Sequence, residues 1–476
     1  MKTYRPTIGL EIHAELATQT KMFCDSKNDP FNAEPNTNVC PICMGHPGTL
    51  PVINKKAVEH VLRVGVAVEG KIADFTEFDR KNYFYPDIPK GYQISQYKYP
   101  LVRGGELADV KITRIHLEED TASSGHDEGD YSLIDFNRAG VPLMELVTEP
   151  IIHSPEQAGN FGRELQLLLR TLGVSEANME KGEMRVEANI SVSDTDKLGT
   201  KVEVKNLNSF KSVEKAIAYE IERHTALLES GKKIEQETRG WDDTKGKTFS
   251  QRKKEDSHDY RYFPDPDLPK MKISEIAEFS RENLAKTMPE LPWEKRKRYA
   301  KIGLKPTDIH IYVTIPEIGA FFDLAVAGIS KKESILLMSN YISSDILGLI
   351  KKKHGEGREN EIAKPPFDPK EFARLIALIE NKIIFSRGAK DILAIMFDRG
   401  GDPEIIANKN GLIQKSDQSV VKKIAKEVIN ENQKVVAEYK KGKLTSLQFL
   451  IGQGMKKSKG SVNPEILKTV IVSLLS

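Results

Sequence analysis

The sequence predicts an α+β protein in which an amino-terminal part that mixes strands and helices is followed by a helical part. Short runs of alternating apolar and polar residues, separated by glycine and proline, fill residues 1 to about 290, and this period of two is typical of strands. Longer helical patterns are inserted among them without regular strand–helix alternation, which favours α+β over α/β. Beyond about residue 290 the patterns are almost wholly helical.

The first predicted strand is the segment GLEIHAELAT, residues 9–18. Successive side chains of a strand point to opposite faces, so one face of this segment is apolar and the other carries Glu11, His13 and Glu15. The strand either offers ligands to a metal or to catalysis, or it is a half-solvated edge strand whose polar face meets water.

Two helices are predicted within the amino-terminal part. The first covers residues 154–173, with Ser154 as its cap and Gly173 at its end, because serine before a proline and glycine after the last apolar residue are helix boundary signals. The second covers residues 212–231 and is predicted to begin at Ser212.

The charged, proline-containing segment 286–299 predicts a domain boundary, and the glycine-rich segment 400–411 predicts a linker. Short amphipathic helices are predicted at 420–429 and 463–475. The predicted domains are residues 1–290, 291–402 and 403–476.

Composition is that of a soluble protein, with 39% hydrophobic and 29% charged residues and a net charge of +2. The first twenty residues carry no charged-then-apolar leader and acidic residues interrupt the apolar stretches, so we expect neither a signal peptide nor a membrane-spanning segment. Three cysteines favour a reducing compartment, and the expected location is the cytoplasm. From Gly411 to Ser476 there are 12 lysines against five acidic residues, which indicates either contact with nucleic-acid phosphates or a solvated lysine-rich surface.

A phosphate-binding loop is excluded by its spacing. Gly240, Gly246, Lys247 and Thr248 are one residue too far apart for the Walker pattern, and no hydrophobic strand precedes them. Residues 242–247 are predicted to form a turn instead.

Four potential metal ligands, Glu11, His13, Glu118 and Glu145, lie on separate strand-like segments. Three carboxylates and one imidazole suit Mg²⁺ or Mn²⁺. A hard cation with open coordination positions is the usual companion of nucleotide phosphates.

A second potential metal site is formed by Cys24, Cys40 and Cys43. A closed zinc site requires four ligands, and nearby only Asp25 and His46 are competent to complete it. The alternative is three reduced thiols without a metal.

The segment 78–97 is dense in tyrosine, basic and amide side chains. It is either a structural loop or a pocket wall that binds a polar substrate or a nucleotide through Arg80, Lys81, Tyr83 and Lys90, with cations that stabilise developing negative charge.

An ordered series of motifs resembles one known family, the B subunits of the aspartyl/glutamyl-tRNA amidotransferases (the GatB/GatE family). The motifs are GLEIHAEL, NTNVCPICMGHPGTLPVIN, FDRKNYFYPDIPKGYQISQY, RIHLEED, DFNRAGVPLMELVTEP, NMEKGEMRVEANISV, VEVKNLNSF, QETRGW, HDYRYFPDPDLP and FLIGQGMKKSKGSVNP. The match runs from about residue 5 to 270 and resumes in the tail.

The resemblance implies a fold and an activity. The fold would be a cradle domain with a sheet like that of glutamine synthetase and guanido kinases, then an all-helical domain and a small helical YqeY-like tail. The activity would be that of a ligase: ATP phosphorylates the side-chain carboxyl of glutamate on tRNA(Gln) or aspartate on tRNA(Asn), and ammonia then forms the amide. The partners would be a glutaminase A subunit and a small C subunit in a heterotrimer.

The resemblance also assigns residues. It implies that Glu11, His13, Glu118 and Glu145 hold Mg²⁺, and that Glu119 and Lys81 lie near the exit of an ammonia channel. The basic tail residues expected to contact tRNA phosphates are Lys456, Lys457 and Lys459. Many members have a fourth cysteine where this chain has Ser26, so the zinc site is incomplete here.

Two other functions remain open from the sequence. In the first, the chain is a tRNA-binding scaffold whose acidic residues only stabilise the fold. In the second, it is a stand-alone ammonia ligase for a small carboxylate, which would have no use for a basic tail.

Overall fold

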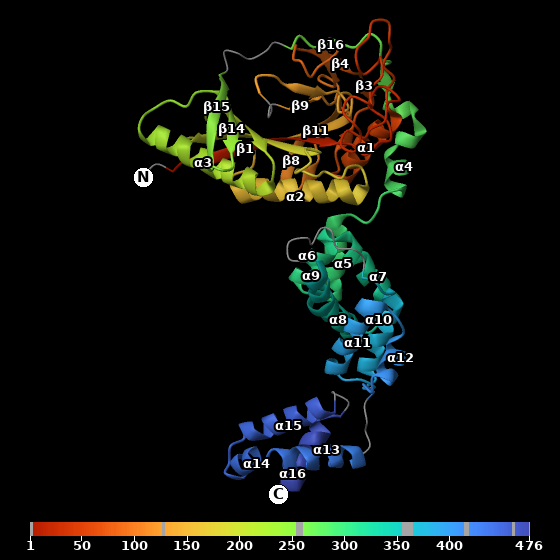
Figure 1. Ribbon diagram of the computed structural model, residues 1–476. Helices are drawn as coiled ribbons and strands as arrows, with labels where there is room; N and C mark the ends of the chain where they lie inside the picture. The colour runs from red at the N-terminus through yellow and green to blue at the C-terminus, as the bar shows by residue number, and fades with distance from the viewer. Residues whose placement is uncertain are drawn as a thin grey trace. The chain divides into compact units, whose positions relative to one another are not determined.

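The structure of the chain is a computed structural model that describes residues 3–125, 129–253, 260–354, 365–413, 418–458 and 462–475. It divides into two compact units, Met1–Pro292 and Trp293–Ser476. The first unit combines a large sheet with helices, and the described part of the second is helical (Figure 1). The predicted α+β class with a helical carboxy-terminal part is confirmed.

A ten-stranded sheet forms the centre of the first unit. Its strand order is β15-β14-β13-β12-β1-β11-β8-β6-β2, with β7 paired to β8. The paired strands are antiparallel, except for the parallel pair β13–β14. The bounds are β1 Arg5–Glu15, β2 Lys71–Ile72, β6 Val102–Arg103, β7 Glu106–Leu107, β8 Val110–Glu119, β11 Pro142–Thr148, β12 Met184–Ser193, β13 Val202–Leu207, β14 Glu237–Asp242 and β15 Lys247–Lys253.

Strand β1 lies in the interior of this sheet, between β11 and β12. The alternative of a half-solvated edge strand is therefore wrong. The apolar residues Ile8, Leu10 and Ile12 are buried on the face covered by helices. The other face carries the acidic and histidine side chains.

Helices α1 (Lys55–Ala67), α2 (Pro155–Leu172) and α3 (Phe210–Glu229) pack in the first unit, and α2 and α3 lie along one side of the sheet (Figure 1). The predicted boundaries of α2 are confirmed, because the Ser154 side chain accepts the Gln157 N–H and Gly173 is left-handed at φ 64°. The predicted start of α3 is wrong by two residues. Ser209 caps this helix by accepting the Ser212 N–H, so the serine predicted as the start lies inside the first turn.

Smaller elements complete the first unit. A three-stranded sheet of order β16-β4-β5 lies on the side of the large sheet opposite α2 and α3 (Figure 1). The turn predicted for residues 242–247 is confirmed as the connection between β14 and β15, where the Lys245 N–H donates to Asp242. The remaining bounds are β3 Phe75–Thr76, β4 Asp79–Asn82, β5 Tyr92–Ser95, β9 Ser123–Gly125, β10 Leu133–Asp135, β16 Phe263–Pro264, β17 Met271–Lys272, η2 Ile273–Glu275, η3 Ala277–Phe279 and α4 Arg281–Lys286.

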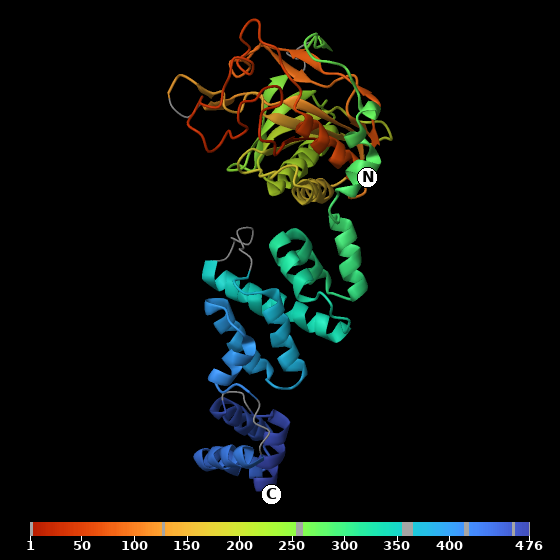
Figure 2. The same cartoon turned by 90° about the vertical axis from the view of Figure 1, so that its right-hand side faces the viewer.

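The second unit is drawn as helices joined by loops (Figure 2). Residues 403–409 form helix α12, capped by Asp402, so the prediction of a linker over 400–411 is wrong. Proline at the first helical position caused the error, since it starts a helix as readily as it marks a loop. Among the described helices, none is long and apolar enough to cross a bilayer. The bounds are α5 Pro292–Ile302, α6 Pro306–Thr314, α7 Pro316–Ala325, α8 Lys332–Tyr341, a π-helical turn Ile342–Ile346, α9 Leu347–His354, α10 Pro369–Glu380, α11 Ser386–Arg399, α12 Pro403–Lys409, α13 Gln418–Glu431, α14 Gln433–Lys440, α15 Thr445–Lys457 and α16 Pro464–Leu475.

The last four helices share a hydrophobic cluster of their own, which includes Val421, Leu450, Leu467 and Ile471. Of the glycine- and lysine-containing segment that starts at residue 449, residues 449–457 belong to helix α15. A Cβ at Gly454 would lie 2.5 Å from the side chain of Leu467, so this glycine permits close contact between α15 and α16.

Candidate active site

The polar face of the large sheet brings four side chains into one row. In the strand register, Arg185 of β12 lies opposite His13 of β1, His13 opposite Glu145 of β11, and Glu145 opposite His116 of β8. Residues that pair across neighbouring strands point to the same face and lie side by side. Strand pairing therefore positions this row.

The four metal ligands predicted from the sequence converge around His13. Its Nε2 atom lies 3.4 Å from Glu145, 3.5 Å from Glu118 and 3.9 Å from Glu11. All four side chains are mostly buried, and Glu11 is the most accessible of them, at 29%. We call these four residues the acidic cluster.

Two further residues that contact the acidic cluster were not predicted from the sequence. His116 Nε2 lies 3.4 Å from Glu145, and Arg114 Nη2 lies 3.2 Å from the same carboxylate. Both lie on β8 at alternate positions from Glu118. The period of two that revealed the polar face of β1 also predicts that these side chains share a face, so the signal was present in the sequence.

The electrostatics of the acidic cluster depend on its buried carboxylates. Burial and then the neighbouring Glu145 carboxylate raise the pKa of Glu11 to about 7. Burial alone lowers the pKa of His13, but a hydrogen bond to Glu145 and the charge of Glu118 outweigh it and raise the pKa to about 9. Burial likewise opposes ionisation of Glu145, yet His116 and His13 hold its pKa well below the usual range. The cluster thus carries excess negative charge that a protonated imidazole partly balances.

The donor atoms of the acidic cluster, together with His116, form two groups that fit a divalent cation. In two overlapping groups, Glu11–His13–Glu145 and His116–Glu118–Glu145, one ligand atom from each residue lies within 4.8 Å of the others. Carboxylate oxygens with an imidazole nitrogen are ligands that Mg²⁺ and Mn²⁺ accept in proteins. A bound cation would take the place of the proton on His13, since metal binding releases protons from its ligands.

Lys81 joins the acidic cluster from the small sheet. It lies on β4, and although burial lowers its pKa, the negative charges of Glu118 and Glu145 and the neighbouring tyrosines together outweigh burial and raise the pKa. Its Nζ atom lies 5.7 Å from the ring centre of Tyr83 and 5.1 Å from that of Tyr260. Tyr83, also predicted as a nucleotide contact, therefore lies beside this ammonium group.

Arg80 is not brought to the acidic cluster. Its guanidinium pairs with Asp265 at 2.8 Å and with Asp267 at 2.9 Å. The guanidinium also lies 4.3 Å from the ring centre of Tyr92. Arg80 thus ties β4 to the segment that follows β16.

Lys90 and Glu119 form a separate ion pair. The Lys90 Nζ lies 2.5 Å from the Glu119 carboxylate, which also accepts the Ile94 N–H at 2.9 Å. The pair lines a cavity of about 10 Å³ together with Cys43 and Asp120. This volume is about that of one water molecule, so the pair fills most of the space around it.

The three cysteines lie together, with Cys24, Cys40 and Cys43 placing their sulfur atoms within 4.8 Å of one another. Ser26 Oγ lies 3.8 Å from Cys43 Sγ, at the position where a fourth sulfur would complete the set. Lys21 Nζ lies 3.8 Å from the same sulfur. Among the described residues, neither Asp25 nor His46 belongs to this group. Because a serine hydroxyl is not a usual zinc ligand, the donors present do not make a closed zinc site.

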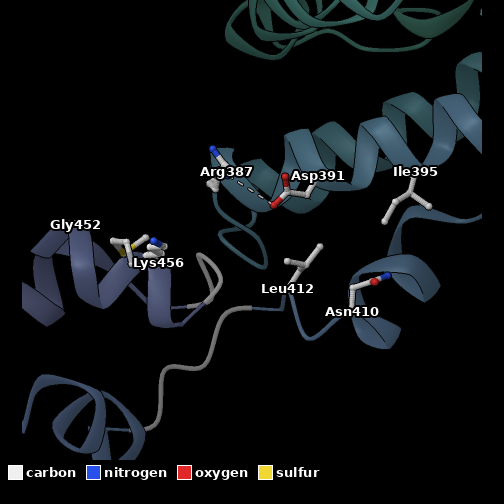
Figure 3. Close-up of a pocket in the computed structure, with 8 residues that line it drawn as sticks. Arg387, Asp391, Ile395, Asn410, Leu412, Gly452 and Lys456 are labelled. Carbon is white, nitrogen blue, oxygen red and sulfur yellow. Dashed lines mark ion pairs between the residues drawn. The ribbon is translucent and has the colours of Figure 1, made fainter. Parts of the chain in front are cut away.

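The predicted tRNA-binding lysines of the tail have different surroundings. Lys456 lines a pocket of about 710 Å³ in the second unit with Arg387 of α11 and Gly452 of α15 (Figure 3). Lys457 pairs with Glu427 at 3.1 Å and also with a second glutamate of α13. Lys459 lies outside the described residues.

Comparison with known proteins identifies the family of the chain. The family model of the GatB/GatE catalytic domain matches residues 6–278, and that of a GatB domain matches residues 321–475. Curated relatives that are named as the B subunit of aspartyl/glutamyl-tRNA(Asn/Gln) amidotransferase include a protein from Thermodesulfovibrio yellowstonii, 44% identical over 99% of both chains. Relatives with this name from Thermus thermophilus and Persephonella marina are each 43% identical, also over 99% of both chains. The chain therefore belongs to the family of the B subunits of tRNA-dependent amidotransferases.

Proposed function

We propose that the chain is the ATP-dependent B subunit of a glutamine-dependent amidotransferase that acts on Glu-tRNA(Gln) and/or Asp-tRNA(Asn). The single observation that carries this function is the convergence of the Glu11, Glu118 and Glu145 carboxylates within 3.4 to 3.9 Å of the His13 Nε2 atom. The full-length similarity to B subunits supports the same substrates. It also supports assembly with a glutaminase A subunit and a small C subunit.

The reaction requires activation because a carboxylate resists attack by ammonia. A side-chain carboxylate oxygen attacks the γ-phosphorus of ATP, and ADP leaves. Ammonia then attacks the carbonyl carbon of the acyl phosphate, and inorganic phosphate leaves as the amide forms. Neither step needs a protein nucleophile, so the work of the protein is positioning and charge stabilisation.

The residues of the acidic cluster would hold Mg²⁺, with Mn²⁺ as the alternative. Such an ion, when bound, neutralises charge on the triphosphate and on the attacking carboxylate. His116 and Arg114 contact Glu145 and fix its orientation. Lys81 lies against two tyrosine rings. Its permanent positive charge would stabilise the negative charge on the phosphoryl group during transfer.

Glu119, which is paired with Lys90, and Lys81 are proposed to lie where ammonia reaches the acyl phosphate. Glu119 directly follows Glu118 on β8, so the ion pair lies next to the acidic cluster along the chain. Its small cavity accommodates a molecule of the size of ammonia.

We infer a three-part organisation, with a cradle domain over 1–290, a helical domain over 291–402 and a tail over 403–476. The separate hydrophobic cluster of the last four helices supports a tail that folds around its own core. The tail would contact the tRNA through lysines, among them Lys456. A tRNA substrate and three free cysteines support a cytoplasmic location.

The test is a reconstituted complex of this chain with its two partner subunits, supplied with ATP, Mg²⁺, glutamine or ammonium, and Glu-tRNA(Gln). We expect ADP release that depends on the aminoacyl-tRNA, and formation of Gln-tRNA(Gln). Glu145→Gln and His13→Ala should abolish both while the complex still assembles and keeps its tRNA affinity. The matched control is Glu156→Gln, an exposed residue in the first turn of α2.

Two results would contradict the proposal. Normal amidation by Glu145→Gln, combined with a lower melting temperature, would identify the chain as a scaffold whose acidic residues stabilise the fold. Efficient amidation of a small carboxylate without tRNA, unaffected by removal of the tail, would identify a stand-alone ligase.

A further inference from the structure

A continuous row of tyrosine rings passes beside Lys81. Tyr85 contacts Tyr83 with ring centres 6.0 Å apart, Tyr83 contacts Tyr260 at 5.6 Å, and Tyr260 contacts Tyr262 at 6.0 Å. Tyr97 stacks flat on Tyr262 at 4.3 Å, with 10° between the ring planes. We call these five residues the tyrosine row.

The tyrosine row comes from segments that are far apart in the sequence. Tyr83 and Tyr85 follow β4, Tyr97 follows β5, and Tyr260 and Tyr262 precede β16. The three strands pair with one another in the small sheet. The folding of this sheet therefore assembles the row.

The middle of the row lies near the acidic cluster. Lys81 lies against the rings of Tyr83 and Tyr260. Burial, opposed by Lys81 and assisted by the charges of Glu118 and Glu145, raises the pKa of Tyr262 to about 12. These two carboxylates are thus close enough to act on a ring of the row.

Both ends of the row face solvent. Tyr97 is 62% exposed and Tyr85 is 50% exposed, although one face of the Tyr97 ring is covered by Tyr262. Rings that only braced the small sheet would be expected inside it, since large aromatic residues are mostly buried when they stabilise a core. The exposed rings instead resemble a stacking surface.

The number of rings in the row indicates which kind of ligand it binds. A mononucleotide has one base and needs one or two rings, whereas an unpaired strand places successive bases on successive aromatic side chains. Positive charge accompanies the row at its middle, from Lys81, and at its Tyr97 end, from Lys98. Lys98 directly follows Tyr97 and lies 5.2 Å from the ring centre of Tyr99. These cations match a phosphate backbone.

We propose that the tyrosine row binds the unpaired 3′ end of the tRNA, with its last bases stacked on the Tyr97–Tyr262 pair. This inference rests on the proposed function, in which the aminoacyl group on the terminal ribose must reach the acidic cluster. A glutamyl or aspartyl side chain spans only a few bonds, so the terminal nucleotide must be held next to the cluster. The tyrosines are positioning residues and take no part in bond making.

The experiment uses the assembled three-subunit complex with Tyr97→Ala and Tyr262→Ala, and with the Tyr97→Phe and Tyr262→Phe variants that keep the ring. Loss of one stacked base should raise the KM for Glu-tRNA(Gln) about tenfold and leave the KM for ATP unchanged. The phenylalanine variants should stay within about twofold of wild type, because stacking needs the ring and not the hydroxyl. Tyr131→Ala, which removes a ring that is 59% exposed outside the row, is the matched control.

A second measurement separates this inference from the proposed function. Wild type and Tyr97→Ala are titrated with intact tRNA and with tRNA trimmed of its unpaired 3′ nucleotides. The variant should bind intact tRNA more weakly and trimmed tRNA as wild type does, whether or not the complex releases ADP. Absence of tRNA-dependent ADP release in wild type would refute the proposed function but not the tyrosine row.

Three results would overturn the inference. A raised KM for ATP with an unchanged KM for tRNA would make the row a site for the adenine of ATP. Equal loss of affinity for intact and trimmed tRNA would place the effect elsewhere on the tRNA. Unchanged kinetics, with a lower melting temperature in both alanine variants, would make the row a structural element.

Discussion

Replacement of Glu220 by glutamine tests whether a buried ionic cluster holds helix α3 against the sheet. Glu220 is fully buried and accepts hydrogen bonds from Arg223 at 2.7 Å and from Thr248 at 2.5 Å. Arg239 Nε lies 3.3 Å from the same carboxylate. Since Thr248 lies on β15 and Arg239 on β14, one carboxylate joins three elements.

The expected loss of stability follows from the pKa shift of Glu220 and from the typical cost of breaking a buried ion pair. Burial opposes ionisation of Glu220, but contacts with His224, Arg223 and Thr248 outweigh it and lower the pKa from 4.5 to about 2. At about 1.4 kcal/mol for each pKa unit, the ionised carboxylate contributes about 3 kcal/mol to the free energy of unfolding. Removal of one partner from a buried ion pair costs about 3 to 5 kcal/mol. We therefore expect Glu220→Gln to lose about 3 kcal/mol at pH 7.

The pH dependence has a defined sign. The folded-state pKa lies below the unfolded value, so the stabilisation is fully present above pH 4.5 and disappears as the pH falls through about 2. The difference between wild type and Glu220→Gln should shrink over this range.

The assay is urea unfolding followed by the fluorescence of Trp241, which lies on β14 next to this cluster. A Trp293→Phe background removes the only other tryptophan of the chain. Glu222→Gln, an exposed substitution on the same helix, should change stability by less than about 0.5 kcal/mol. A loss below about 1 kcal/mol for Glu220→Gln, or a loss that stays constant from pH 6 to pH 3, would refute this reasoning.

Three further predictions concern other parts of the chain. Gly454→Ala should lower the stability of the tail by about 1 to 2 kcal/mol in thermal unfolding, because its Cβ would come 2.5 Å from a leucine of α16; Gly452→Ala, which meets open space, should be neutral or stabilising. Ser26→Cys should complete a four-sulfur site and retain about one zinc per chain after dialysis against a chelator, whereas wild type should lose its zinc; equal metal content by mass spectrometry would contradict this. Lys456→Ala should weaken tRNA binding and reduce the slope of log affinity against log salt by about one, whereas Lys457→Ala, whose ammonium is already paired with glutamates of α13, should leave that slope unchanged.

The parts of the site that follow local rules could be predicted from the sequence. Alternation along β1 predicts that Glu11 and His13 share a face, and strand pairing then adds Glu145 and Glu118. The same rule places His116 on the polar face of β8, although the acidic residues around it are the more obvious metal ligands. The helix α2 was predictable because its cap and its terminal glycine act over a few residues only.

The parts that depend on distant segments could not be predicted from local patterns. Arg80 and Lys81 are adjacent in the sequence, but only the pairing of β4 with β16 places one against Asp265 and the other at the acidic cluster. The tyrosine row needs the same pairing to bring Tyr260 beside Tyr83. Likewise, Lys457 forms its ion pairs with a different helix of the tail. The sequence shows the positive charge of this lysine but not that the charge is already paired.

Strand β1 sets the hydrophobic core and the acidic cluster together, because the two sets of side chains alternate along one backbone. A shift of one residue in its pairing would expose Leu10 and Ile12 to the polar side and bury Glu11 and His13 among the helices. The same pairing register therefore determines both the burial of the apolar residues and the position of the acidic cluster. A chain that buries the apolar residues of β1 correctly therefore also places Glu11 and His13 in the acidic cluster.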